Sequence, residues 1–217
     1  MNTLTSPRIV ELLDRLFNES DRSEPAMEAV AQSDAFHLLT SRTGYREFYG
    51  LLKDIPLPVS RETGALLYML ARATRAQAVL EFGTSFGVST IYLAAALRDN
   101  GGGRIITTEF ESSKAARARE HLTEAGLIDL VEIREGDALE TLAHDLPDTL
   151  DFVLLDGAKA LYADILHRIE TRLRPGSIVL ADDAHRCPEF VSRMRSDAAR
   201  YLSVPLTGDL ELSTRLS

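Results

Sequence analysis

Short apolar segments alternate with amphipathic ones between residues 78 and 182, and this alternation constrains the fold more than any other feature of the sequence. We expect strands over 78–82, 104–109, 130–134, 151–156 and 177–182, with helices over 87–99, 112–125, 137–144 and 160–173. The segments FVLL and SIVLA are nearly continuous apolar runs, which is typical of parallel strands covered on both faces. Since crossovers between parallel strands share one handedness, the pattern predicts a doubly wound, Rossmann-like α/β sheet.

The N-terminal segment predicts a helical extension before this core. Apolar residues with helical spacing lie in residues 7–18, and a polar break follows at 20–25. Two prolines make 55–60 extended or turning, and Ser60 is expected to cap a helix over 61–75. The stripe consists of Ile9, Leu12, Leu13, Leu16 and Phe17. Because an amphipathic helix needs a partner and the sequence offers none inside the domain, we expect a homodimer that uses residues from about 1–55.

The C-terminal segment predicts a hairpin. Residues 201–206 and 209–216 both read as strands, and Thr207 and Gly208 separate them. We therefore expect an antiparallel pair that closes one edge of a mostly parallel sheet. A length of 217 residues suits a single domain, with 1–55 as the N-terminal extension and 56–217 as the cofactor-binding α/β core.

The composition narrows the class of partner. A net charge of −9 and a pI of about 5.1 argue against nucleic acid or an anionic membrane, since both require a concentrated basic face. The N-terminus lacks the apolar core of a signal peptide, and no apolar run approaches the ~20 residues that cross a bilayer. One cysteine, Cys187, rules out an internal disulfide and suits a reducing compartment. We expect a cytoplasmic protein with a small-molecule ligand.

Acidic residues mark the end of every expected strand. They are Glu81, Glu109, Asp137, Asp156 and the pair Asp182 and Asp183. In open α/β sheets ligands bind beyond the carboxyl ends of the strands, so these side chains are expected at one edge. Clustered carboxylates repel one another unless a cation or a hydroxyl-rich ligand lies among them. The pattern therefore predicts a binding site at this edge.

The stretch VLEFGTSFGVST indicates what binds there. Gly83 and Gly87 allow a sharp turn and a close approach of a ligand to the next helix, where Ser89 can hydrogen-bond a carboxylate. The spacing E-x-G-x-x-x-G differs from the G-x-G-x-x-G of a pyrophosphate cradle. Glu109, at the end of the next strand, suits a ribose diol. A nucleoside with a carboxylate-bearing tail, such as S-adenosylmethionine, fits both features.

The residues also resemble a known family. The stretch PVSRETGALLYMLARATRAQAVLEFGTSFGVSTIYLAAAL, followed by ITTEFE, GDALETL, DFVLLDGAK and GSIVLADD, is similar to the class I S-adenosylmethionine-dependent O-methyltransferases, in particular the catechol and caffeoyl-CoA groups. The resemblance covers roughly residues 55–185 in order, and more loosely the tail VPLTGDLELSTRL. It implies transfer of a methyl group from S-adenosylmethionine to a hydroxyl oxygen of a small aromatic or natural-product acceptor.

The resemblance also implies roles for single residues. Cofactor-binding positions are Val59, Glu81, Gly83, Thr84, Ser89, Glu109, Ala138 and Asp156, with Glu109 at the ribose and Ala138 at the adenine. Asp156, Asp182 and Asp183 occupy the positions of the family's metal ligands, which implies a divalent cation such as Mg²⁺. Lys159 matches the lysine that catechol enzymes use as general base, and proximity to a cation implies a depressed pKa for it.

Two departures keep alternatives open. The family's third metal position is normally asparagine, and here it is Asp183; the segment AHRCPEF that follows also differs from the metal-dependent groups. The sequence is therefore also consistent with a metal-independent methyltransferase in which Asp183 or His185 is the base. An NAD(P)-dependent oxidoreductase shares the sheet and Glu109, and a non-catalytic nucleoside-binding protein shares everything except competent Asp156, Asp182 and Lys159.

Overall fold

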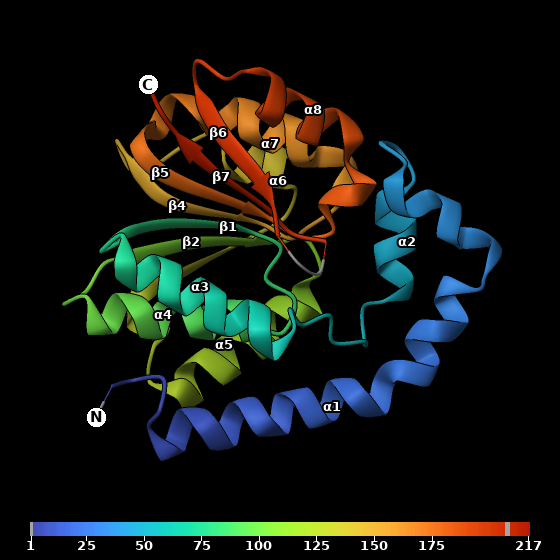
Figure 1. The fold of residues 1–217 in the computed structure, drawn as a ribbon. Helices are drawn as coiled ribbons and strands as arrows, with labels where there is room; N and C mark the ends of the chain where they lie inside the picture. Colours follow the sequence, from blue (N-terminus) through green and yellow to red (C-terminus); the bar gives the residue numbers. More distant parts are fainter. Residues whose placement is uncertain (1, 207–208) are drawn as a thin grey trace.

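The computed structural model describes residues 2–206 and 209–217, and its centre is a seven-stranded sheet with the order β3-β2-β1-β4-β5-β7-β6 (Figure 1). The strands are β1 (Ala78–Phe82), β2 (Arg104–Glu109), β3 (Val131–Glu135), β4 (Leu150–Leu155), β5 (Leu173–Ala181), β6 (Tyr201–Pro205) and β7 (Glu211–Arg215). β1 to β5 pair in parallel, whereas β7 runs antiparallel to β5 and β6. The doubly wound sheet and its edge hairpin are confirmed; the expected turn residues, Thr207 and Gly208, lie outside the described residues.

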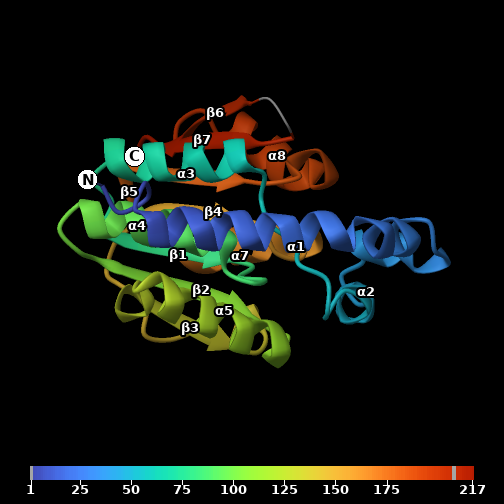
Figure 2. The ribbon, with the colours of Figure 1, turned by 90° about the horizontal axis from the view of Figure 1, so that it is seen from below.

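Helices cover both faces of the sheet (Figures 1 and 2). The helices are α1 (Pro7–Ala31), α2 (Tyr45–Leu51), α3 (Arg61–Ala73), α4 (Val88–Asp99), α5 (Ser112–Ala125), α6 (Ala138–Thr141), α7 (Tyr162–Ile169) and α8 (Pro188–Ser196). Neighbouring strand residues face opposite ways, so Val79 and Phe152 join one core with α1, α3, α4 and α5, while Leu80 and Val153 join a second core with α7 and α8. Two buried cores, one on each face, are what the continuous apolar strands predict.

Several element boundaries differ from those predicted. β5 begins at Leu173, ahead of the predicted 177, because Leu173 already pairs with Leu150 before the register shifts. The helix expected over 160–173 is divided into a 3₁₀ turn, α7 and a second 3₁₀ turn at Glu170–Arg172. The helix expected over 137–144 is reduced to α6. The N-cap prediction at Ser60 is confirmed, since its Oγ accepts the Thr63 N–H at 3.0 Å.

The predicted polar break at 20–25 is wrong, because α1 continues through it to Ala31. Pro25 lies inside the helix, and Figure 1 shows α1 bending upward in its second half. Polar side chains bond back to the helix here, with Arg22 Nε donating to the Asn18 carbonyl and Ser23 Oγ to that of Glu19. A polar, exposed helical turn thus resembles a loop in sequence.

The apolar stripe of α1 packs within the chain, which contradicts the reason given for a homodimer. Its five members, Ile9, Leu12, Leu13, Leu16 and Phe17, are 1–7% exposed and join the core that contains α3 and α4. Ion pairs Arg15–Glu124 and Arg117–Glu19, both 2.5 Å, also join α1 to α5. The long sequence separation between α1 and these partners hid the contact.

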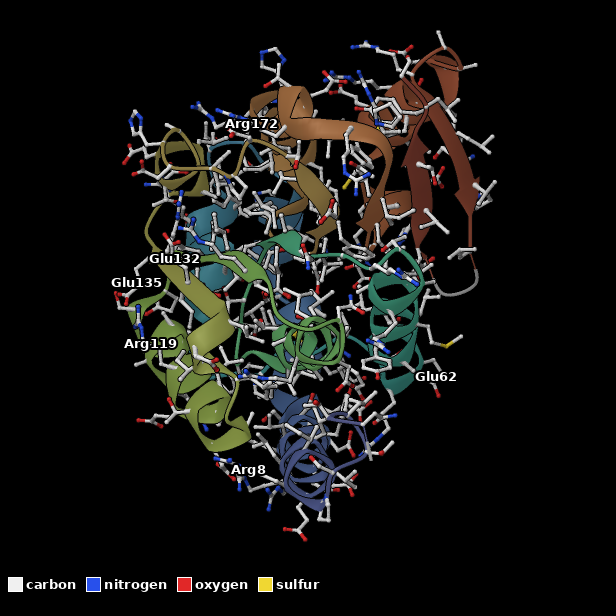
Figure 3. The ribbon with its side chains drawn as sticks, turned by 90° about the vertical axis from the view of Figure 1, so that its left-hand side faces the viewer. Arg8, Glu62, Arg119, Glu132, Glu135 and Arg172 are labelled. Carbon is white, nitrogen blue, oxygen red and sulfur yellow. The ribbon has the colours of Figure 1, made fainter. Side chains whose placement is uncertain are left out.

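Charged side chains lie mostly outside these cores. Figure 3 shows Arg119 of α5 beside Glu135 of β3, an ion pair of 2.5 Å. Pairs of this exposed kind contribute about 0–1 kcal/mol each, so the two cores hold the fold. Within residues 2–206 and 209–217, no helix is both long and apolar enough to cross a membrane.

Candidate active site

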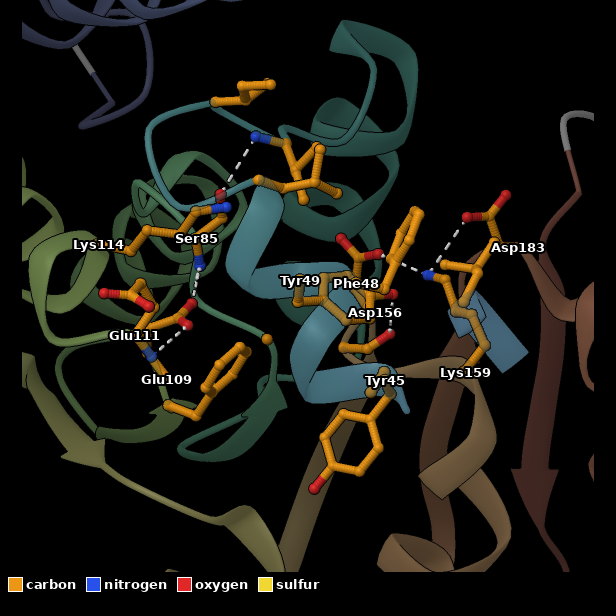
Figure 4. Close-up of a pocket in the computed structure, with 18 of the residues that line it drawn as sticks. Tyr45, Phe48, Tyr49, Ser85, Glu109, Glu111, Lys114, Asp156, Lys159 and Asp183 are labelled. Carbon is orange, nitrogen blue, oxygen red and sulfur yellow. Dashed lines mark hydrogen bonds and ion pairs between the residues drawn. The ribbon is translucent and has the colours of Figure 1, made fainter. Parts of the chain in front are cut away.

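A cavity of about 490 Å³ lies beyond the carboxyl ends of β1, β2, β4 and β5. Its floor is formed by residues at or directly after the ends of these strands, such as Gly83, Glu109 and Asp156. Its roof comes from the second half of α1, the 3₁₀ helix Asp34–Thr40 and α2, which contributes Phe48 and Tyr49. Figure 4 shows Ser85, Glu109, Glu111 and Lys114 on one side and Asp156, Lys159 and Asp183 on the other. The N-terminal extension thus covers the edge where the sequence predicts a ligand.

Gly83 directly follows β1, close to the end of β4. Its φ is +106°, and a Cβ built there meets the carbonyl oxygen of Asp156 and the nitrogen of Gly157, both at 2.7 Å. Any side chain at this position therefore pushes the ends of β1 and β4 apart. Gly87, with φ +87°, begins α4. The glycine at 83 therefore lets the loop after β1 pass close to the segment after β4 at the cavity.

Glu109 is held with its carboxylate fixed at the end of β2. It is 8% exposed, and it accepts backbone N–H groups of Ser85 at 2.8 Å and Glu111 at 3.0 Å, one on each oxygen. Burial raises its pKa, and these N–H groups and nearby Lys114 oppose the rise. Each carboxylate oxygen keeps a lone pair for a further donor. This geometry suits a group with two adjacent hydroxyls.

Glu81 lies behind the cavity rather than on its wall. Its carboxylate is fully buried and accepts hydroxyl hydrogens from Ser89 at 2.6 Å, Thr90 at 2.5 Å and Thr107 at 2.6 Å. Burial raises its pKa. Glu81 therefore ties β1, β2 and α4 together beneath the glycine loop, and its expected contact with the cofactor stays a prediction.

The other predicted cofactor residues divide into two groups. Ala138 lines the cavity together with Gly136 and Asp137, on the side of β3 where adenine is expected. Val59, Thr84 and Ser89 are buried and are not among the described residues that line the cavity. The Thr84 hydroxyl bonds instead to Thr107 at 2.6 Å. Their roles toward the cofactor also stay predictions.

Lys159 is a buried lysine surrounded by oxygen atoms. Its Nζ donates to Asp156 Oδ1 at 3.1 Å and to the Tyr162 hydroxyl at 3.0 Å, and it lies 3.4 Å from Asp183 Oδ2. The Tyr162 hydroxyl donates onward to the carbonyl of Asp182 at 2.9 Å. Although burial opposes it, these neighbours raise the pKa of Lys159 well above its ordinary value. The depressed pKa expected from the sequence depends on a cation beside the amine, and it stays a prediction.

Asp156 and Asp182 form a close pair at the ends of β4 and β5. Burial and the neighbouring carboxylate raise the pKa of Asp156 to about 8, and burial raises that of Asp182. Two carboxylates this close repel one another unless a proton or a cation lies between them. All-oxygen ligands suit Mg²⁺, so a divalent cation fits the pair.

Asp183 is less well placed than Asp156 and Asp182 to bind a shared cation. Its carboxylate is turned toward Lys159 at 3.4 Å and Arg186 at 3.8 Å. Within the described ranges, the group of three whose ligand atoms lie within 4.8 Å of one another is Asp183, His185 and Asp209. His185 is 46% exposed at its side chain, pairs with Asp209 at 3.4 Å and is not among the described residues that line the cavity. Its role as a base stays a prediction.

Some residues of the site were missed in the sequence. Tyr162 completes the surroundings of Lys159, and its position one helical turn beyond Lys159 in a predicted helix gave a usable signal. Lys114 lines the cavity from the first turns of α5, five positions after Glu109. Ser20, Asp21, Ser23, Glu24 and Met27 of α1 line it as well, and no local pattern indicates this.

With this geometry in place, known proteins give a consistent comparison. Residues 80–184 match a family model described as a methyltransferase domain. A putative O-methyltransferase of Mycobacterium sp. is 33% identical over 156 residues, which are 67% of this chain and 69% of that protein. Catechol O-methyltransferases of Niastella koreensis and Mycobacterium tuberculosis are both 35% identical, over 60% of this chain. The matches span 59% and 58% of the length of these two relatives.

Two solved structures agree in fold, and one of them is a complex with SAM. The O-methyltransferase TomG from Streptomyces achromogenes, involved in tomaymycin synthesis and solved in complex with SAM, has a TM-score of 0.66 and 28% identity over 86% of this chain and 91% of its own. A methyltransferase from Geobacter sulfurreducens has a TM-score of 0.66 and 29% identity, with 98% of both chains covered.

Proposed function

We propose, since this chain belongs to the family of class I O-methyltransferases, that it transfers the methyl group of S-adenosylmethionine to a hydroxyl oxygen of a small aromatic or natural-product acceptor. The observation that carries the proposal is the single cavity in which Glu109 lies at one side and Asp156 with Lys159 at the other. Glu109 suits the ribose of the cofactor. The similarity to catechol O-methyltransferases and to TomG, solved in complex with SAM, supports the proposed cofactor.

Methyl transfer from a sulfonium is an in-line displacement in which the S–CH₃ bond breaks as an O–CH₃ bond forms. The enzyme supplies alignment and an acceptor oxygen that loses its proton. In this proposal Lys159 is the group that takes the acceptor's proton. This requires the raised pKa of its amine to fall, as it would if Asp156 and Asp183 turned to a bound cation. The aromatic residues Phe36, Tyr45, Phe48 and Tyr49 line the roof and give an apolar surface for the acceptor ring.

A divalent cation, Mg²⁺ by ligand chemistry, is proposed at Asp156, Asp182 and Asp183. When bound, such an ion orients adjacent phenolic oxygens and lowers the pKa of one of them. The chain's own contribution is the pairing of β4 with β5, which places Asp156 and Asp182 at adjacent strand ends.

The test is product formation. Purified protein is incubated with S-adenosylmethionine and a panel of catechols and hydroxylated aromatic compounds, and products are followed by mass spectrometry with and without Mg²⁺. Methylated product that requires S-adenosylmethionine supports the proposal. Activity that persists in excess chelator indicates the metal-independent alternative, with Asp183 or His185 as base. Nicotinamide-dependent oxidation without methylation indicates an oxidoreductase instead.

The homodimer and the cytoplasmic location also stay predictions. The buried stripe of α1 no longer supports a dimer through residues 1–55, since its partner lies within the chain. Light scattering at micromolar concentration tests the dimer, and a monomer contradicts it.

A further inference from the structure

Lys114 is a buried lysine on the wall of the cavity, on the same side as Glu109 (Figure 4). The residue is 4% exposed, and its Nζ lies 5.7 Å from the centroid of the Phe86 ring. Within residues 2–206 and 209–217, no hydrogen bond or ion pair joins its ammonium to another group. Lysines are almost never buried unless they are paired. The partner of Lys114 is therefore expected inside the cavity that it lines.

The charges around Lys114 indicate the chemistry of that partner. Burial lowers its pKa, the carboxylates of Glu109, Glu111 and Asp54 each oppose this, and the resulting pKa is about 8. Three carboxylates around one ammonium leave the surroundings negative, which disfavours an anionic ligand such as a phosphate. A neutral group that accepts from the ammonium and donates to a carboxylate is favoured.

Glu109 supplies the second half of such a site. Both of its oxygens already accept a backbone N–H, and both can accept one more hydrogen. A vicinal diol meets the two needs at once, because its hydroxyl hydrogens point to Glu109 while its oxygen lone pairs accept from Lys114. We propose that Lys114 binds the ribose diol of the nucleoside cofactor together with Glu109; this rests on the proposed use of S-adenosylmethionine.

The experiment measures dissociation constants of S-adenosylhomocysteine by calorimetry for the wild type, Lys114→Met and Lys114→Gln. Lys53→Met is the matched control, because Lys53 is exposed and is not among the described residues that line the cavity. Each protein is also titrated with analogues that lack the 2′ or the 3′ hydroxyl. Thermal melting of each variant reports whether it is folded.

We expect Lys114→Met to weaken binding of S-adenosylhomocysteine about 10-fold or more, the usual loss for a hydrogen bond from a charged group. Lys53→Met is expected to leave it unchanged. The wild type is expected to bind one of the two deoxy analogues more weakly than S-adenosylhomocysteine. Lys114→Met is expected to bind that analogue almost as well as the wild type does, because the hydroxyl that Lys114 contacts is already missing. Equal affinity in a folded Lys114 variant, or the same loss with every analogue, overturns the inference. No binding by the wild type overturns the proposed function itself.

Discussion

Lys159 donates a hydrogen bond from Nζ to Oδ1 of Asp156 over 3.1 Å. Asp156 directly follows β4, and Lys159 begins the 3₁₀ turn that comes next. The bond places the amine at the acceptor side of the cavity, next to both Asp156 and Asp183. In the proposed function this is where the acceptor oxygen loses its proton.

Substitution of Lys159 is therefore expected to affect turnover rather than cofactor affinity. Lys159→Met is expected to lower turnover by roughly 10²–10⁴, the range for loss of a positioned general base. Lys159→Arg keeps the charge, and a guanidinium does not release its proton, so a similar loss is expected. Steady-state methylation assays check both. Near-normal turnover in Lys159→Arg excludes the role as base and leaves an electrostatic one.

Removal of the cation is expected to abolish transfer and to leave cofactor binding largely intact, because Glu109 lies at the opposite side of the cavity. Asp182→Ala is expected to have the same effect as a chelator, since it removes the partner of Asp156. Methylation and S-adenosylhomocysteine affinity are measured in parallel, with and without chelator. Full turnover in excess chelator shows that the proposed cation site is wrong, and then substitution of His185 is expected to cause the larger loss.

Glu81 is expected to make stability depend on pH. Burial raises its folded pKa above the ordinary 4.5, so its contribution is fully present below that value and is lost as the pH rises through the folded pKa. Glu81→Gln removes the titration while keeping the shape, and its free energy of unfolding is expected to fall less over this range than that of the wild type. Urea unfolding at several pH values checks this. Parallel curves contradict the raised pKa.

Much of the site follows from the sequence because parallel strands end at one edge. That rule alone placed Gly83, Glu109 and Asp156 around one cavity before any contact was known. The features that this rule does not predict depend on tertiary packing. The burial of α1 against α3 and α4 joins residues distant in the chain, and a polar exposed turn at 20–25 has the composition of a loop. The surroundings of Lys159 depend on how Tyr162 and Asp183 turn, which sequence spacing does not specify.

Binding of the nucleoside at Glu109 is the central claim, and calorimetric titration of the wild type and Glu109→Ala with S-adenosylhomocysteine tests it most directly. We expect saturable binding to the wild type and a loss of about 1.5–3 kcal/mol in the variant, the usual range for hydrogen bonds to a charged group. A folded variant is confirmed by thermal melting, and NAD is titrated in parallel. Unchanged affinity in folded Glu109→Ala, or binding of NAD without S-adenosylhomocysteine, contradicts the account.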